Sequence, residues 1–407
     1  MATILRFRAL RPRPERAAAV AAVPYDVVDA TEARALAADD PLSFLRVSRP
    51  EIDLPEDTDP HADLVYETGV RNFARLRAEA PLVQDDMPSL YVYRLRMDEH
   101  VQTGVAGCFS VDEYEADVIR KHERTRKDKE DDRTRHILEL RAQTGPVFLT
   151  YPASTSVDVA VTETTASPPL FDFVAPDGVQ HTVWRVAEGV DDDLVSAFDA
   201  IAALYIADGH HRAASAMRAR QAIRAGAPGA GRIEADSFLA VAFPDDQTQV
   251  LPYHRVVTDL AGHSPESFLD GLREQVEVGP GTDTPAEPGE VSMYLAGEWY
   301  ALHLVPPPDG TAPADRLDVQ RLHDQVLAPL LAIGDPRTDE RIGFVGGIRG
   351  PGALVERVDS GTAAVAFAMS PVSVADLMGI ADSGGIMPPK STWFEPKLRD
   401  GLLTHLI

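Results

Sequence analysis

The sequence Asp208-Gly209-His210-His211-Arg212 combines residue types that bind and transform anions. It follows an apolar segment, 203–207, that is predicted to be a strand, and it precedes a segment, 213–223, predicted to be a helix. Gly209 permits a tight turn with positive φ, and the amides after it would open a helix whose N-terminus carries partial positive charge. Arg212 adds a planar fork that matches phosphate, while the two histidines add hydrogen-bond donors or acid–base groups.

The alternative interpretation of this turn is a capped helix start whose histidines make only local hydrogen bonds. A cation at a helix N-terminus opposes the helix dipole, so Arg212 should gain little locally unless an anion is bound. An anion site is therefore favoured. Asp208 could cap the helix, fix a histidine tautomer or hold Mg²⁺. Two adjacent histidines do not by themselves indicate zinc.

A second segment, 120–136, has 17 residues, of which eight are basic and five acidic, giving a net charge of +3. A solvated helix with pairs such as Glu123 and Lys127 explains most of it. This interpretation explains His122 and Glu123 less well, because they lie near the head of the run, shortly after the apolar Val118 and Ile119. A carboxylate beside cations stays ionised and can accept a hydroxyl proton, so Glu123 is a candidate base.

Two weaker signals lie near the two ends of the sequence. The turn at Tyr25 and Asp26 follows Pro24, and a structural role is the favoured interpretation from the sequence alone. Lys390, Ser391 and Thr392 offer a cation and two hydroxyls, which suit phosphate but are also common in loops. No P-loop, G-x-S-x-G or G-x-G-x-x-G signature is present.

The overall charge limits the class of partner. The 407 residues include 64 acidic and 39 basic ones, for a net charge of −25. Such a field repels polyanions, which argues against general nucleic-acid binding. Cys108 is the single cysteine, so no intrachain disulfide or cysteine-based metal site is expected. The sequence has no signal-peptide core and no membrane-length apolar run, which predicts a cytoplasmic protein without membrane partners, and it is compatible with a homo-oligomer.

Both strands and helices are predicted to position these residues. Alternating patterns predict a hairpin at 89–97 and 101–110, a buried strand at 147–151, and further strands between 238 and 368. Helical spacing appears at 64–79 and 319–331. We expect an α+β fold with mixed or antiparallel sheets and flanking helices. The length predicts an N-terminal region at 1–110, a phosphate-binding core at 111–260, and a C-terminal region at 261–407 that contributes to the same site.

Five separated strings resemble one conserved, uncharacterised family of bacteria and archaea, whose genes often lie beside that for phosphoserine aminotransferase. The likeness covers essentially the whole chain, with Val23 where a second proline is expected. It adds His254 and Arg255 to the candidate site residues. The strings are 24–27, 121–125, 207–212, 251–255 and 387–394.

Residues 118–220 are more distantly similar to the free-serine kinases of the ParB/sulfiredoxin superfamily. The likeness rests on the order His-Glu, helix, Gly-Pro-Val-Phe-Leu strand, then strand, Asp-Gly-His-His-Arg turn and helix. It implies a ParB/sulfiredoxin-like core in which Glu123 is the base toward serine and 208–212 hold nucleotide phosphates. About fifty extra residues between Tyr151 and Tyr205 are a departure from that group.

These observations together predict a phosphoryl-transfer enzyme that acts on a small hydroxy-amino acid such as serine, with ATP or ADP and Mg²⁺. One alternative is a phosphatase acting on O-phosphoserine through a histidine nucleophile, and another is a non-catalytic nucleotide-binding regulator. The predicted catalytic residues are Glu123, His210 and His211. The predicted binding residues are His122, Asp208, Gly209, Arg212, Tyr25, Asp26, His254, Arg255, Lys390, Ser391 and Thr392.

Overall fold

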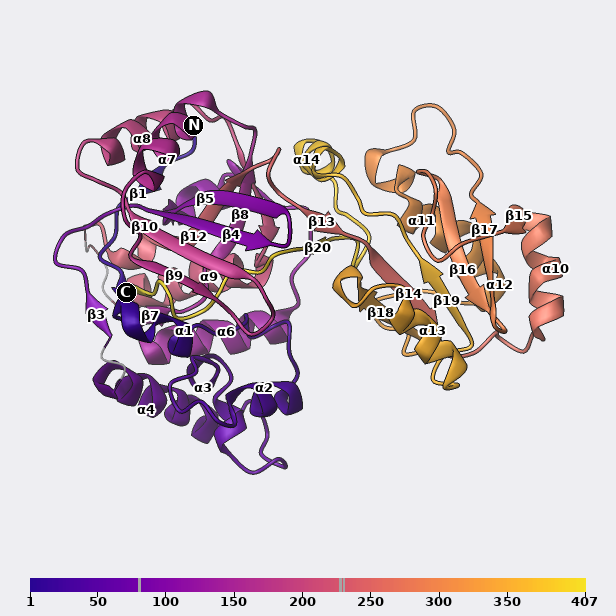
Figure 1. Ribbon diagram of the computed structural model, residues 1–407, viewed down its shortest axis with the longest axis horizontal. Coiled ribbons are helices and arrows are strands. Elements are labelled where there is room, and N and C mark those ends of the chain that lie inside the picture. Colours follow the sequence, from indigo (N-terminus) through magenta and orange to yellow (C-terminus); the bar gives the residue numbers. More distant parts are fainter. Residues whose placement is uncertain (80–81, 227–228, 230) are drawn as a thin grey trace. The chain divides into compact units, whose positions relative to one another are not determined.

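The chain folds into two compact units, seen in a computed structural model that describes residues 1–79, 82–226, 229 and 231–407 (Figure 1). Unit 1 comprises Met1–Thr248 and Pro396–Ile407, and unit 2 comprises Gln249–Glu395. The C-terminal segment thus returns to unit 1 after unit 2. This division differs from the three regions predicted from the sequence.

Unit 1 contains most of the elements. Its helices are α1 (Ala17–Val20), α2 (Ala30–Ala37), α3 (Leu45–Ser48), α4 (Asp63–Glu79), α5 (Val111–Glu115), α6 (Lys127–Leu140), α7 (Thr155–Thr165), α8 (Val190–Asp199) and α9 (His210–Gly226). Its strands are β1 (Ile4–Leu5), β2 (Leu10–Arg11), β3 (Val83–Gln84), β4 (Tyr91–Met97), β5 (His100–Ser110), β6 (Ile119–Arg120), β7 (Ala142–Gln143), β8 (Val147–Tyr151), β9 (Phe171–Val174), β10 (Gln180–Arg185), β11 (Leu204–Asp208), β12 (Ser237–Pro244) and β21 (His405–Leu406).

A mixed sheet forms the centre of unit 1. Its strands run in the order β6-β11-β8-β12-β5-β4-β10-β9, with β1 paired to β5. The pairs β6–β11 and β8–β12 are parallel, and the others are antiparallel. Because β5 pairs with both β4 and β12, the predicted regions 1–110 and 111–260 share one sheet, and residue 110 is not a boundary between units.

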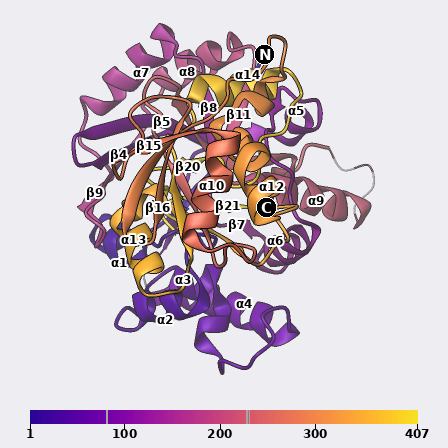
Figure 2. The same ribbon diagram turned by 90° about the vertical axis from the view of Figure 1, so that its right-hand side faces the viewer.

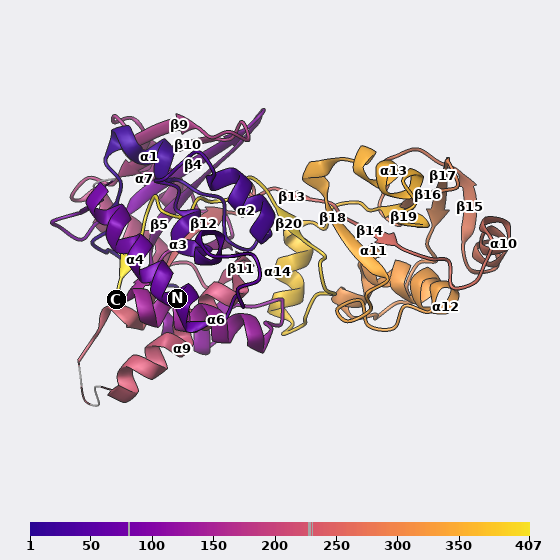
Figure 3. The ribbon, with the colours of Figure 1, turned by 90° about the horizontal axis from the view of Figure 1, so that it is seen from below.

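Helices pack on this sheet through small or apolar side chains. Helices α7 and α8 contribute Val157, Leu194 and Phe198 to the main core, and α9 contributes the small residues Ala213 and Ala214. Helices α6 and α9 lie side by side (Figures 1 and 3). A separate apolar cluster joins α2, α3 and α4 to Leu140 at the end of α6. The N-terminus of α9 is therefore fixed against both the sheet and α6.

Unit 2 is built on an antiparallel sheet of strand order β15-β17-β16-β19-β14-β18. Its strands are β13 (Val250–Leu251), β14 (Tyr253–Val257), β15 (Glu277–Pro280), β16 (Glu290–Leu295), β17 (Glu298–His303), β18 (Ile342–Gly346), β19 (Val365–Ala368) and β20 (Trp393–Phe394). Its helices are α10 (Pro265–Gln275), α11 (Asp318–Leu322), α12 (Ala328–Leu331), α13 (Gly352–Asp359) and α14 (Val374–Asp382), and a π-helical segment (His323–Leu327) joins α11 to α12.

The faces of the unit 2 sheet carry different helices. Helix α13 covers one face, and α11 and α12 cover the other (Figure 3). Helix α10 contacts β15 and α12 (Figure 2). Strands β13 and β20 pair with each other, so the two ends of unit 2 are joined by a short antiparallel ribbon. The predicted α+β fold with mixed and antiparallel sheets and flanking helices is confirmed. In the described part of the chain, no helix is long and apolar enough to cross a bilayer.

Candidate functional site

Strand pairing brings the two strongest sequence signals together in unit 1. Strand β6 pairs in parallel with β11, so Arg120 lies opposite Tyr205. Parallel strands end at the same edge of a sheet, and the residues after β6 therefore lie beside the end of β11. The pairing of β11 with β8 shifts register between Ile206 and Asp208. Such an irregularity changes the direction in which the following side chains point.

The turn into α9 requires a glycine. Gly209 has φ +96°, a conformation that other residues adopt only with strain. A Cβ there would lie 3.1 Å from Nε of Arg212 and 3.4 Å from Cα of Val147. Helix α9 begins at His210, three residues before the predicted start at 213, and its first turn contains no acidic residue. The predicted strand–turn–helix is present, with the histidines inside the helix.

His122 and His210 form a buried pair of imidazoles. Their ring centroids are 4.5 Å apart and the rings are nearly perpendicular, at 86°. Within the described residues, Nδ1 of His122 and Nε2 of His210 are buried without a hydrogen-bond partner. Burial lowers the pKa of His122 to about 4, although Asp208 opposes the shift. Burial and the neighbouring His122 lower the pKa of His210 well below its usual value. Both rings are therefore neutral at pH 7.

Glu123 lies next to this pair and remains accessible. Its carboxylate is 3.6 Å from Nδ1 of His210, and its side chain is 44% exposed. The predicted helix does not include it, since α6 begins only at Lys127. The pairing of Glu123 with Lys127 across one helical turn is thus wrong, because residues 121–126 are not helical and lead from β6 to α6.

His211 is positioned differently from His210. Its Nε2 accepts a hydrogen bond from the backbone N–H of Arg126, at 3.0 Å. Burial lowers the pKa of His211, while Asp26 and Glu130 oppose the shift. The ring therefore connects the start of α9 to the segment before α6.

Arg212 has partners within the protein, some of them distant in the sequence, which the sequence interpretation did not expect. Its guanidinium is 3.2 Å from the carboxylate of Asp208 and 3.4 Å from that of Asp26. It also donates to the carbonyl oxygen of Pro146. The side chain is only 8% exposed. Burial disfavours its charge, but Asp26, Asp208 and Asp400 outweigh burial and raise its pKa. The expectation that Arg212 gains little without an anion is wrong, because carboxylates from distant parts of the chain surround it.

Asp208 is held as an anion by two cations. Burial opposes its ionisation, but Lys397 and Arg212 outweigh burial and lower its pKa below the usual range. The Nζ atom of Lys397 lies 3.3 Å from the Asp208 carboxylate. Lys397 was missed in the sequence, where its only signal is its place just after the 387–394 string. It belongs to the C-terminal segment that returns to unit 1.

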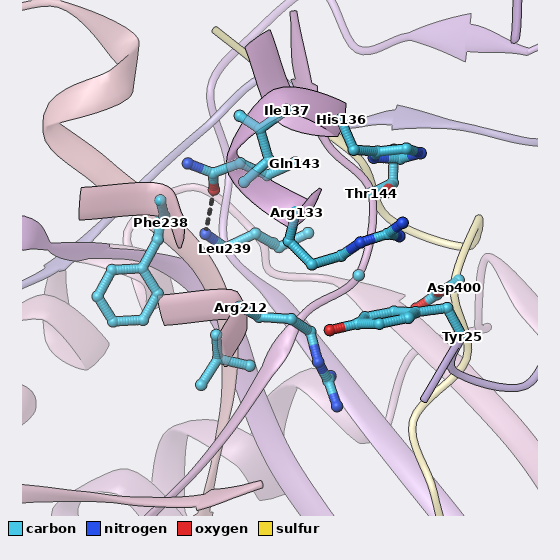
Figure 4. A pocket seen from close by; sticks show the side chains of 13 residues that line it. Tyr25, Arg133, His136, Ile137, Gln143, Thr144, Arg212, Phe238, Leu239 and Asp400 are labelled. Atoms are coloured by element: carbon cyan, nitrogen blue, oxygen red, sulfur yellow. Dashed lines mark hydrogen bonds between the residues drawn. The ribbon is translucent and has the colours of Figure 1, made fainter. Parts of the chain in front are cut away.

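Behind Arg212 lies a small cavity, also lined by Tyr25, Arg133, His136 and Asp400 (Figure 4). Its volume is about 30 Å³, room for on the order of one or two water molecules and not for a nucleotide. The Tyr25 ring lies 4.3 Å from the Arg133 guanidinium. The predicted turn is present, since the N–H of Val27 donates to the carbonyl of Pro24.

Asp400 is a buried carboxyl at this cavity. Burial raises its pKa to about 7, and Arg212 only partly offsets that effect. One of its carboxyl oxygens, Oδ2, has no hydrogen-bond partner among the described residues. Asp400 can therefore exchange a proton near neutral pH.

The remaining predicted residues belong to unit 2. The Nδ1 atom of His254 accepts from the backbone N–H of Met369, at 3.1 Å, and burial lowers the pKa of His254 to about 4. The hydroxyl of Ser391 donates to the carbonyl of Pro388. Lys390 has φ +56°, and its Nζ atom is 5.7 Å from the Tyr253 ring. These contacts connect His254 and Ser391 to backbone groups inside unit 2.

Arg255 and Thr392 complete the predicted set, and both also lie in unit 2. Arg255 lies on β14 and donates to the carbonyl of Lys390. That His254, Arg255 and residues 390–392 share the site at α9 stays a prediction.

A metal ion is not favoured by the protein groups alone. No cluster of three or more His, Cys, Asp or Glu side chains in the described part of the chain could hold one. Asp208, the predicted Mg²⁺ ligand, is engaged by Lys397 and Arg212. Residues of unit 1 therefore do not fit a protein-only Mg²⁺ site.

Comparison with known proteins identifies the family. The family model described as "Protein of unknown function (DUF1015)" matches residues 4–320, so the chain belongs to this family. Membership of an uncharacterised family was predicted and is confirmed, whereas the gene neighbourhood stays a prediction. No curated protein sequence matches the chain significantly.

Several solved structures are distantly similar. They include free serine kinase in complex with AMP, at 13% identity and TM-score 0.35, covering 74% of this chain and 91% of that one. SbnI with C-terminal truncation from Staphylococcus aureus is 12% identical, with TM-score 0.40 and coverage of 74% and 87%. A conserved hypothetical protein from Pyrococcus furiosus is 14% identical, with TM-score 0.35 and coverage of 74% and 95%. Similarity this low carries no argument about the site.

Proposed function

We propose that this member of the DUF1015 family is a phosphoryl-transfer enzyme acting on a small hydroxy-amino acid such as serine, with ATP or ADP as the nucleotide. The observation that carries the proposal is the position of Glu123, an accessible carboxylate 3.6 Å from the buried His210 at the N-terminus of α9. An acceptor for a hydroxyl proton thus lies beside a helix end that attracts phosphate.

Each group has a distinct part in the proposed reaction. Glu123 accepts the proton of the substrate hydroxyl as the hydroxyl oxygen bonds to phosphorus, and the donor P–O bond breaks with its electron pair leaving on the donor oxygen. Neutral His210 orients the Glu123 carboxylate. The first amides of α9 offset the charge of the transferring group. Arg212 and Lys397 act as positioning residues, because both are already paired with Asp208.

The nucleotide would supply the phosphoryl group, and Mg²⁺ would neutralise its phosphates. The cavity behind Arg212 is too small for a nucleotide. The nucleotide would therefore approach the accessible side of the site, where Glu123 lies. Because Asp208 is engaged by two cations, any Mg²⁺ would be carried mainly by the phosphates.

A phosphatase is the second candidate, and the neutral imidazoles favour it. An unprotonated histidine can attack phosphorus, and the low pKa of His210 keeps that ring unprotonated at pH 7. His211 is less suited through Nε2, which already accepts a hydrogen bond. A non-catalytic nucleotide-binding regulator is the third candidate, and it needs no group acting as a base.

A ligand screen followed by an activity assay separates these functions. Thermal shifts would be measured with ATP, ADP, serine and O-phosphoserine, with and without Mg²⁺. Phosphorus NMR would then follow transfer from ATP to serine. Phosphate release from O-phosphoserine without nucleotide selects the phosphatase, and nucleotide binding without turnover selects the regulator. A protein that none of these ligands stabilises contradicts all three functions.

The variant that tests the mechanism is Glu123→Gln. It should lower kcat by about 10²- to 10⁴-fold, the usual contribution of a general base, while ligand-induced thermal shifts are retained. The matched control is Lys127→Gln, at the exposed start of α6, which should keep nearly full activity. Equal losses in the two variants would remove the base assignment.

A further inference from the structure

Unit 2 contains a cavity of about 190 Å³, against about 30 Å³ for the cavity behind Arg212. Every residue that lines it lies between 255 and 389, within unit 2. The sheet supplies Arg255 of β14 with Ile342 and Phe344 of β18, and the opposite wall comes from α11 and the π-helical segment. The cavity is thus enclosed between the sheet and the helices on one of its faces.

Arg255 is a buried cationic side chain that lines this cavity. Its side chain donates to the carbonyls of Tyr253 and Lys390 and lies 5.6 Å from the Phe344 ring. Arg255 is only 3% exposed, yet no carboxylate among the described residues forms an ion pair with it. Arg212 is similarly buried, but two carboxylates flank its guanidinium. Burial without a counter-charge lowers the pKa of Arg255 to about 10.

A buried cation without an anion is unfavourable, because no opposite charge offsets the free-energy cost of removing the cation from water. A fold that keeps an arginine in this state needs another reason for it. A bound anion supplies one, since a guanidinium pairs well with planar or tetrahedral oxyanions. The position of Arg255 on a cavity wall gives such an anion a place to bind.

The cavity offers a second unsatisfied group. Nδ1 of His323 is buried without a hydrogen-bond partner in the described part of the chain. His323 lines the cavity and starts the π-helical segment, a rare geometry that is often found at functional sites. Gln320, one turn earlier, also lines the cavity. Among the described residues that line the cavity, Asp335 is the one acidic side chain, and Arg337 neutralises it through contacts of 2.7–3.1 Å.

We propose that unit 2 binds a small organic anion in this cavity, with a carboxylate or phosphate head on Arg255 and a small apolar body against the surrounding side chains. His323 and Gln320 provide further hydrogen bonds to the head group. Apolar residues such as Val319, Leu327 and Pro388 form much of the remaining wall. This site lies within unit 2 and does not depend on the function proposed for α9.

The test uses the full-length protein and titration calorimetry. The probes are 3-methylbutanoate and propyl phosphate, which separate the two head groups, with 3-methylbutanamide as the neutral control. At least one anion should bind and the amide should not. Arg255→Met should weaken binding about tenfold to a hundredfold, the usual effect of losing a charge-assisted contact. The surface variant Arg273→Met should bind like the original protein, because Arg273 is exposed and pairs with Asp270 outside the cavity.

The melting temperature of the ligand-free protein distinguishes a binding role of Arg255 from a structural role. Arg255→Met should leave it unchanged or raise it, because the variant removes an uncompensated buried charge while preserving an unbranched side chain. Glu123→Gln should bind the probes normally, so a failure of the function proposed for α9 is distinguishable. Absence of anion binding, or equal binding by Arg255→Met, overturns the proposal. A large fall in the melting temperature of Arg255→Met overturns it as well, by making Arg255 structural.

Discussion

Replacing Arg212 with methionine should destabilise unit 1, contrary to the neutral effect expected when its charge is judged from the helix dipole alone. The variant leaves the carboxylates of Asp26 and Asp208 without the guanidinium that lies 3.4 and 3.2 Å from them. Breaking a buried ion pair by removing one partner costs about 3–5 kcal/mol. Asp208 retains Lys397, and Asp26 is partly exposed, so we expect the lower end, about 3 kcal/mol of unfolding free energy.

The assay is urea unfolding followed by the fluorescence of Trp184. The other two tryptophans, Trp299 and Trp393, lie in unit 2 and would be changed to phenylalanine in the reference protein, so that the signal reports unit 1. The expected loss corresponds to a fall in Tm of about 6–12 °C for a unit of this size. The control is Arg75→Met, which removes an exposed pair with Glu79 and should cost at most about 0.5 kcal/mol. A loss for Arg212→Met no larger than that of the control would refute the argument.

Two further changes should give defined results in the same assay. Burial raises the pKa of Asp400 from 3.8 to about 7, so between about pH 4 and pH 7 the unfolded chain releases this proton while the folded state retains it, and stability falls as pH rises over that window. Asp400→Asn should therefore match the original protein near pH 4 and exceed it by up to about 4 kcal/mol at pH 8, and parallel pH profiles would contradict this. Gly209→Ala should cost about 1–3 kcal/mol, since alanine is strained at φ +96° and its Cβ would lie 3.1 Å from Arg212. Gly178→Ala shares the positive φ, at +84°, but meets nothing within 4 Å, so it should cost less, and equal losses would show that crowding at Gly209 is unimportant.

The elements with strong periodicity could be predicted from the sequence. The strand at 147–151 coincides with β8, and the helix at 64–79 differs from α4 by one residue. Alternation in the 89–110 hairpin was enough to indicate antiparallel pairing, and hence an α+β class. These segments have one face that must be buried, so local pattern and tertiary structure agree.

The segment from 152 to 202 could not be interpreted in the same way. It contains α7, β9, β10 and α8. Helix α7 is rich in threonine and valine, which are poor helix formers, and it buries only Val157, Ala160 and Thr164. Its helical form depends on packing against α8 and the sheet rather than on local preference.

The candidate site, too, could be predicted only in part from the sequence. The type and spacing of residues 208–212 were sufficient to predict a strand, a glycine turn and a helix. They could not show that Asp26, Lys397 and Asp400 would meet Arg212 and Asp208, since those contacts span about 190 residues of chain. Charge balance at a buried arginine is a tertiary property, so a helix-dipole argument alone leaves out the carboxylates that pair with Arg212.

The insertion of unit 2 within unit 1 has a consequence for biosynthesis. Lys397 and Asp400 follow unit 2 in the chain, whereas their partners Asp208 and Arg212 precede it. A ribosome adding about 5–20 residues per second needs roughly 7–30 s to make the 147 residues of Gln249–Glu395. During that interval the nascent chain contains Asp208 and Arg212 but does not yet contain Lys397 and Asp400. The complete charge arrangement, and any activity that depends on it, can arise only after the segment Pro396–Ile407 has left the exit tunnel.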